Sequence, residues 1–253
     1  MLGFGMDLPT VLRAGSQGAL FAAVTISGTL LLGWWLGRRL SIGARASALI
    51  SAGTAICGGS AIAAVGSVIG AEEGELSVAM GTVFILNAVA LSVFPALGHA
   101  LGLSQTQFGT WAGVAVHDIS SVVGAAATYG ASALQVATAV KLSRALWILP
   151  LSLAAAYAFR QQTGGRSAVK VPWFIGFFLL ASVARSSAPA VAAAAPVLAR
   201  AATVGLTLTL FLIGAGLSAQ TLRSVGWRPL LQGVLLWLFI TVASLLVIMR
   251  LPA

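Results

Sequence analysis

The chain has 253 residues, of which 59% are hydrophobic and 8% are charged, whereas soluble domains carry about 25% charged residues. A chain this apolar cannot hide its side chains in one water-soluble core, so lipid must act as its solvent. The net charge of +9 does not indicate nucleic acid binding, because the Lys and Arg residues fall mostly between apolar runs and form no basic stripe with interleaved aromatics.

Eight apolar runs follow one another along the chain, and a transmembrane helix needs about 20 such residues. The predicted spans are residues 17–36, 46–70, 76–97, 109–129, 134–159, 171–183, 202–217 and 230–249. The second is interrupted at Cys57-Gly58-Gly59 and the fourth at His117-Asp118. We therefore expect an all-α integral membrane protein, a single transmembrane domain over residues 1–253, with about eight helices of which two are interrupted.

Loop charges give the predicted orientation. If the loop with Arg38, Arg39 and Arg45 is cytoplasmic, eight basic residues lie inside and four outside, and the acidic run Glu72–Glu75 falls outside. If the two interrupted segments are instead re-entrant hairpins, the basic loops keep their sides and the acidic run moves. Charge counting therefore leaves spanning and re-entrant segments as alternatives.

Two internal similarities resemble the faint repeats of secondary transporters. Residues 53–60 resemble residues 113–120, and residues 2–6 resemble residues 213–217. Chance alignment of Gly- and Ala-rich helices is the alternative. The second similarity makes residues 2–6 the end of a helix, so we expect an N-terminal portion to be missing.

The interruption around Cys57, Gly58, Gly59 and Ser60 is the first candidate binding site. A half-helix that starts near Ser60 would point free N–H groups and a positive dipole at the bilayer midplane, which suits an anion. Close helix packing through small residues is the alternative. With one cysteine and two histidines in the chain, neither a disulfide nor a metal site is expected, and no cofactor is predicted.

The second candidate site lies at the other interruption. His117 and Asp118 are ionisable groups inside a span, so we expect them to face a cavity or a partner group, and the pair could take up and release a proton. The hydroxyls of Ser120 and Ser121 could add ligands. Capping of a short helix at the membrane surface is the alternative.

Lys141 and Arg144 form the third candidate site, since three positions apart they share a helix face. Facing the interior, they would attract an anion or neutralise Asp118; the alternative is that their stems reach back to the interface. Asn87, within the third span, is expected to hydrogen-bond across helices in a structural role.

These residues carry a resemblance to a known family. Residues 56–62, residues 109–113 running into His117-Asp118 and residues 119–123, and Val140-Lys141-Leu142-Ser143-Arg144 resemble the YeiH-type membrane proteins, whose inferred function is sulfate export. The resemblance implies a bacterial inner-membrane, multi-pass protein of about ten or eleven helices, distantly similar to the bile acid/sodium symporter-like fold with inverted repeats. On this comparison, two or three N-terminal helices are absent.

The predicted function is secondary transport that exports a small inorganic anion of sulfate or sulfite type. The predicted substrate-binding residues are Cys57, Gly58, Gly59, Ser60, Ser120, Ser121, Lys141 and Arg144, with His117 and Asp118 coupling protons. A passive anion channel is one alternative, and a membrane-embedded enzyme with Ser120 or Cys57 as nucleophile is another, disfavoured because sequence neighbours rarely reach the triad-type geometry. The expected partners are the anion and the bilayer, and assembly into a homo-oligomer is an open alternative.

Overall fold

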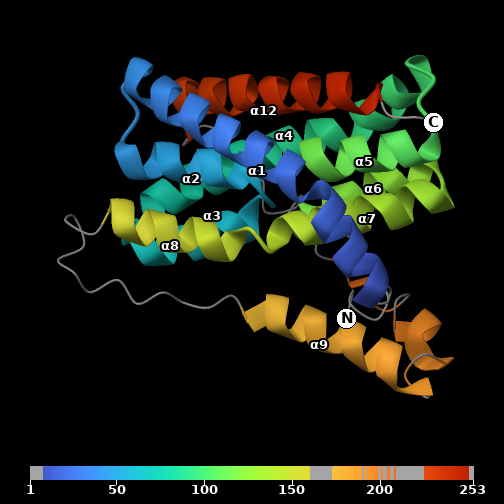
Figure 1. Cartoon of the computed structure of the whole chain (residues 1–253). Coiled ribbons are helices and arrows are strands. Elements are labelled where there is room, and N and C mark those ends of the chain that lie inside the picture. The colour runs from blue at the N-terminus through green and yellow to red at the C-terminus, as the bar shows by residue number, and fades with distance from the viewer. Residues whose placement is uncertain are drawn as a thin grey trace.

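A computed structural model describes residues 8–159, 173–189, 191, 193–198, 201, 204–205, 208 and 225–250 (Figure 1). Every regular element among them is an α-helix, which confirms the all-α class. Of the eight predicted spans, residues 202–217 lie mostly outside the described residues. The run 171–183 corresponds to α9 (Trp173–Ser187), whose 15 residues reach about 22 Å, short of the ~30 Å hydrocarbon layer.

Four helical rods among the described residues are long and apolar enough to cross a membrane. They are α1 (Leu8–Arg39), α4 (Glu73–Ala100), the pair α7 (Ala131–Ala145) and α8 (Ile148–Ala158) joined by a turn, and α12 (Trp227–Ile248). Each matches a predicted span within a few residues, apart from the extra N-terminal turns of α1. Figure 1 shows α4 and α12 running the length of the bundle.

The second predicted span is a helical hairpin. Helices α2 (Ala44–Ala55) and α3 (Gly59–Ile69) flank the predicted break. A Cβ atom placed on Gly53 would lie 2.8 Å from Ile62 Cδ1, and one placed on Gly66 would lie 3.5 Å from Leu49 Cδ2. A continuous helix would hold positions 49 and 66 about 25 Å apart, so the chain reverses at the break and α3 returns along α2.

The fourth predicted span folds in the same way. Helices α5 (Gln105–Ala115) and α6 (Ile119–Tyr129) flank the break at Val116–Asp118. The rings of Phe108 and Tyr129 stack with centroids 3.8 Å apart, and the Tyr129 hydroxyl donates to the Leu103 carbonyl oxygen at 2.6 Å. A continuous helix would separate positions 108 and 129 by about 31 Å, so α6 also doubles back.

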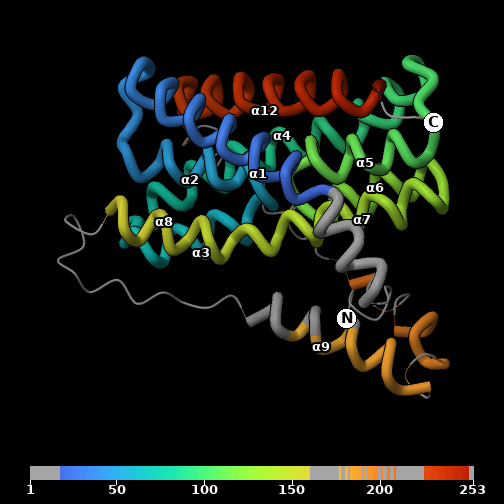
Figure 2. Tube along the Cα trace, in the orientation of Figure 1, coloured from blue at the N-terminus to red at the C-terminus, as the bar shows by residue number. Residues whose placement is uncertain are grey.

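The two hairpins enter the bundle from opposite ends. Figure 2 shows α2 and α3 at one end of the molecule and α5 and α6 at the other. Two of the eight predicted spans are therefore helical hairpins, because the breaks reverse the chain rather than only kinking it. The acidic run Glu72–Glu75 consequently lies at the same end of the bundle as the loop between α1 and α2, as the re-entrant alternative predicts, and Glu72 and Glu75 form the capping box of α4.

Small residues let the helices approach closely, as is common in membranes. On α5, Gly109 and Gly113 face α7: a Cβ atom at these positions would lie 2.6 Å from Ala133 O and 2.9 Å from Ala137 O. On α1, Gly33 and Gly37 face α2 in the same way. These contacts fix α7 against the second hairpin and α1 against the first, which places the polar residues of α7 beside the hairpin tips.

Candidate functional site

The first hairpin tip is a glycine turn. Gly58 has φ 64° and ψ −126°, a conformation that side chains other than hydrogen strongly disfavour. Gly58 is also the N-cap of α3, and no side chain caps the N–H groups of the first turn. The N-terminus of α3 therefore presents unneutralised positive potential at the tip.

Cys57 and Ser60 lie within that tip. The Cys57 Sγ and Ser60 Oγ atoms are 2.8 Å apart, and the Ser60 hydroxyl donates to the Cys57 carbonyl oxygen at 3.2 Å. Cys57 is buried and Gly59 and Ser60 are partly exposed. The first turn of α3 is thus not fully covered by the rest of the described protein.

At the second tip, the charged side chain of Asp118 lies at the start of helix α6. The Asp118 carboxylate accepts hydrogen bonds from the backbone N–H groups of Ser120 and Ser121, at 3.0 and 3.1 Å, and so caps α6. Asn87 on α4 supports the same turn, because its Oδ1 atom accepts from the N–H groups of His117 and Asp118 at 3.1 and 3.2 Å. Asp118 therefore caps a short helix, as the alternative interpretation from sequence expects, but it does so at the hairpin tip inside the bundle instead of at the membrane surface.

The two tips touch each other. A Cβ atom placed on Gly58 would lie 3.4 Å from the carbonyl carbon of His117 and 3.5 Å from Asp118 Cα. Two short sequences separated by 60 positions thus meet where the hairpins converge. The structure brings together the first two predicted sites.

Lys141 and Arg144 on α7 complete this centre. The Lys141 ammonium donates to the Ile56 carbonyl oxygen at 3.0 Å. The Arg144 guanidinium donates to the Ala55 carbonyl oxygen and, at 3.0 Å, to the Thr25 hydroxyl on α1. Both cations are at most 2% exposed, so they point inward, and the alternative of reaching back to the interface does not apply.

The balance of charge at the tips favours an anion. Electrostatic interactions link Lys141 with Cys57, His117, Asp118 and Arg144. With all groups ionised, two cations face one carboxylate. The two cations also bind the negative C-terminal end of α2, and Asp118 binds the positive N-terminal end of α6. The N-terminus of α3 has no such partner, so it is left as an attractive position for negative charge.

His117 is held differently from its neighbours. Its side chain is buried, and neither ring nitrogen has a hydrogen-bond partner among the described residues. Its ring centroid lies 6.5 Å from that of Trp237 on α12. His117 thus faces away from Asp118's hydrogen bonds and toward α12.

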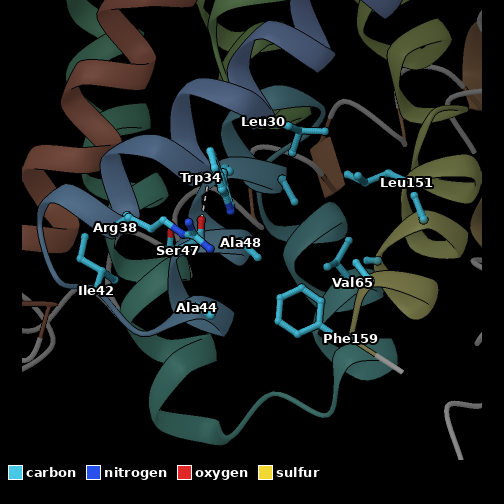
Figure 3. A pocket seen from close by; sticks show the side chains of 16 residues that line it. Leu30, Trp34, Arg38, Ile42, Ala44, Ser47, Ala48, Val65, Leu151 and Phe159 are labelled. Atoms are coloured by element: carbon cyan, nitrogen blue, oxygen red, sulfur yellow. Dashed lines mark hydrogen bonds between the residues drawn. The ribbon is translucent and has the colours of Figure 1, made fainter. Parts of the chain in front are cut away.

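A groove leads toward the first tip from the end of the bundle where α2 begins. Its volume is about 570 Å³, and it lies between α1 and α2 on one side and α3 and α8 on the other. Figure 3 shows Trp34, Arg38 and Ser47 on one wall and Val65 and Phe159 on the other. The lining residues Leu30 and Leu151 also pack against the cluster that contains Ala55, Ile56 and Cys57.

Sequence reasoning missed two contributors to this centre. Thr25, which binds Arg144, stands in an apolar run where a threonine commonly bonds its own helix, as it also does here to the Phe21 carbonyl oxygen. Trp237 on α12, whose ring lies beside that of His117, gave no signal, because tryptophan in a membrane span is usually an interfacial anchor. Among the described residues, no group of three or more His, Cys, Asp or Glu side chains could hold a metal ion.

These features define the class of the protein: a multi-pass, all-helical membrane protein whose broken helices and buried charges meet inside an apolar bundle, as in transporters. The chain belongs to the UPF0324 family of membrane proteins. Residues 1–233 match the family described as "Conserved hypothetical protein 698", and the resemblance to YeiH-type proteins is confirmed.

Three relatives show the extent of the similarity, and each is called a UPF0324 membrane protein. The relative from Bacteroides thetaiotaomicron is 52% identical over 96% of this chain and 74% of its own length. The Porphyromonas gingivalis protein is 54% identical over the same shares, and GSU2818 of Geobacter sulfurreducens is 47% identical over 99% of this chain and 79% of its length. No solved structure matches the chain.

Proposed function

We propose that this protein is a secondary transporter that exports a small inorganic anion, of sulfate or sulfite type, across the bacterial inner membrane. The observation that carries the proposal is the contact between the two hairpin tips, Gly58 against His117 and Asp118. Irregular backbone at membrane depth is tolerated only where protein buries it or where it lines a watery cavity. The anion would sit at the N-terminus of α3, near Gly59 and Ser60, with Lys141 and Arg144 supplying positive potential.

We also infer an inverted repeat. Helix α6 (Ile119–Tyr129) begins and ends 60 positions after α3 (Gly59–Ile69). The two hairpins open toward opposite ends of the bundle. A pseudo-two-fold axis in the membrane plane relates such elements in many transporters and supports alternating access around a central site.

The groove supports access from one side. It ends at Leu30 and Leu151, which pack over the first tip. Separation of the first hairpin from α1 and α8 would open the site to the end of the bundle that carries Arg38. Protonation of His117 or Asp118 would then couple export to the proton gradient.

The two alternatives have less support. An enzyme would need a base bound to its nucleophile, but the His117 ring nitrogens bond no described residue and the Cys57 thiol contacts Ser60. A channel would need no proton coupling, and single-channel recording would reveal its far higher flux.

Flux of radiolabelled sulfate and sulfite into proteoliposomes that contain the full-length protein tests the proposal. We expect saturable flux that a pH gradient drives, and at least a tenfold loss with Lys141→Ala or Arg144→Ala, because each removes a buried cation from the site. Arg228→Ala is the matched control, since Arg228 lies over the Trp227 ring at the start of α12. Equal flux in the wild type and both site variants would remove the role assigned to these cations.

A further inference from the structure

A set of buried polar groups lies on the α12 side of the second hairpin tip. Among the buried side-chain atoms that have no hydrogen-bond partner in the described part of the chain, five lie here: Asn87 Nδ2, both ring nitrogens of His117, Trp237 Nε1 and Thr241 Oγ1. Asn87 and His117 are 4% and 1% exposed. Each such atom left unpaired costs about 1–3 kcal/mol, so four residues of this kind in one region indicate a site that a ligand completes.

The residues that carry these groups come from three elements beside the second tip. Asn87 on α4 bonds the backbone of the second tip at His117, and the His117 ring lies 6.5 Å from the Trp237 ring on α12. Thr241 follows Trp237 by one helical turn, which places both on one face of α12. Trp237 is in turn 6.0 Å from the ring of Phe94, measured between centroids, so aromatic packing fixes its orientation.

The hydrogen-bonding inventory selects the ligand. The Asn87 amide offers two N–H donors, the Trp237 indole one and the Thr241 hydroxyl one, while a neutral His117 offers one donor and one acceptor. Donors therefore outnumber acceptors. Several separate donors suit a ligand with several acceptor oxygens more than a spherical halide with a single centre.

We propose that Asn87, Trp237 and Thr241 form a subsite that binds the oxygen atoms of a small oxyanion and selects it over halides. The subsite rests on the proposed function, since it is a second contact surface for the transported solute, opposite the one at α3. His117 lies between the two surfaces and can take up a proton from a protonated oxyanion.

Binding of sulfate, sulfite and chloride to the purified full-length protein, measured by thermal shift at constant ionic strength, tests this subsite. Trp237→Phe keeps an aromatic ring beside Phe94 and removes the indole N–H together with the rest of the five-membered ring. We expect the apparent Kd for the oxyanion to rise roughly tenfold or more and chloride binding to stay the same. Thr241→Val, which keeps the side-chain shape, should act in the same direction.

Trp111→Phe is the matched control, because the Trp111 Nε1 atom already donates to the Thr241 carbonyl oxygen at 3.0 Å. That variant should lower stability in the absence of ligand and change oxyanion affinity little. An unchanged oxyanion Kd in both Trp237→Phe and Thr241→Val, with binding abolished by Lys141→Ala, would overturn the subsite and leave the proposed function standing. Failure of the wild type to bind any oxyanion would overturn both.

Discussion

The Lys141 ammonium on α7 donates a hydrogen bond to the carbonyl oxygen of Ile56, at the C-terminal end of α2, over 3.0 Å. The bond joins a membrane-spanning helix to the tip of a re-entrant hairpin. It also places a cation on the negative end of the α2 dipole. The charge that sequence analysis assigned to the solute therefore also holds the hairpin in position.

Removal of that cation should loosen the hairpin. Lys141→Met keeps the apolar stem but leaves the Ile56 carbonyl oxygen without its charged donor, which we expect to lower the free energy of unfolding by about 1.5–3 kcal/mol. Thermal unfolding in detergent measures the change. Arg228→Met, at the exposed start of α12, is the control and should change stability little; equal stability of both variants would show that the bond contributes nothing.

The two adjacent glycines of the first tip should respond differently to alanine. At Gly58 the positive φ disfavours any side chain, and a Cβ atom there would stand 3.3 Å from Val83 Cγ1, so Gly58→Ala should destabilise by about 1–3 kcal/mol. At Gly59, which lies within α3, a Cβ atom would meet only the Phe84 ring at 3.4 Å. Gly59→Ala should therefore be tolerated in thermal unfolding, and a reversed order of the two variants would contradict the tip geometry.

The Asp118 carboxylate has two separable roles, a helix cap and a charge. Asp118→Asn keeps an oxygen that can accept from the N–H groups of Ser120 and Ser121, so stability should change little. Asp118→Ala removes the cap and should lower stability by about 0.5–2 kcal/mol. If proton-driven flux is lost in both variants while only alanine destabilises, the charge itself serves transport; full flux in Asp118→Asn would exclude Asp118 from proton coupling.

The re-entrant hairpins predict which loops share a side of the membrane. In a Cys57→Ser background, cysteines introduced at Gly43 and Gly74, where a Cβ atom meets nothing within 4 Å, should react with an impermeant thiol reagent from the same side. Cysteines at Leu101 and Ser132 should react from the opposite side. Labelling of positions 43 and 74 from opposite sides would show that residues 46–70 cross the membrane.

The breaks were predictable from sequence, but their direction was not. Adjacent glycines interrupt one apolar run and an ionisable pair interrupts another, so the positions of both tips follow from composition. Whether the chain continues or reverses depends on the φ and ψ angles of Gly58 and on contacts such as Phe108 with Tyr129, which apolar composition does not encode. For the same reason the basic loops were compatible with both topologies.

The site was predicted unevenly for a similar reason. Charged residues in apolar runs indicate a buried polar centre whatever the fold, so Asp118, Lys141 and Arg144 could be identified. Their partners could not be identified, because every residue has a backbone carbonyl oxygen. Only the end of α2 at the hairpin tip leaves the carbonyl oxygens of Ala55 and Ile56 available to accept from side chains. Trp237 and Thr241 needed the packing of α12 against the second tip to become visible.

Cys57, the single cysteine of the chain, reports directly on whether solute occupies the tips. It lies beside Ser60 at the start of α3, so a bound anion should shield it. We expect increasing sulfate or sulfite to slow the alkylation of Cys57 in the purified protein along a saturation curve, and Lys141→Ala to abolish this protection. A rate of Cys57 alkylation that stays constant at anion concentrations that saturate transport would contradict a solute site at the meeting point of the two hairpins.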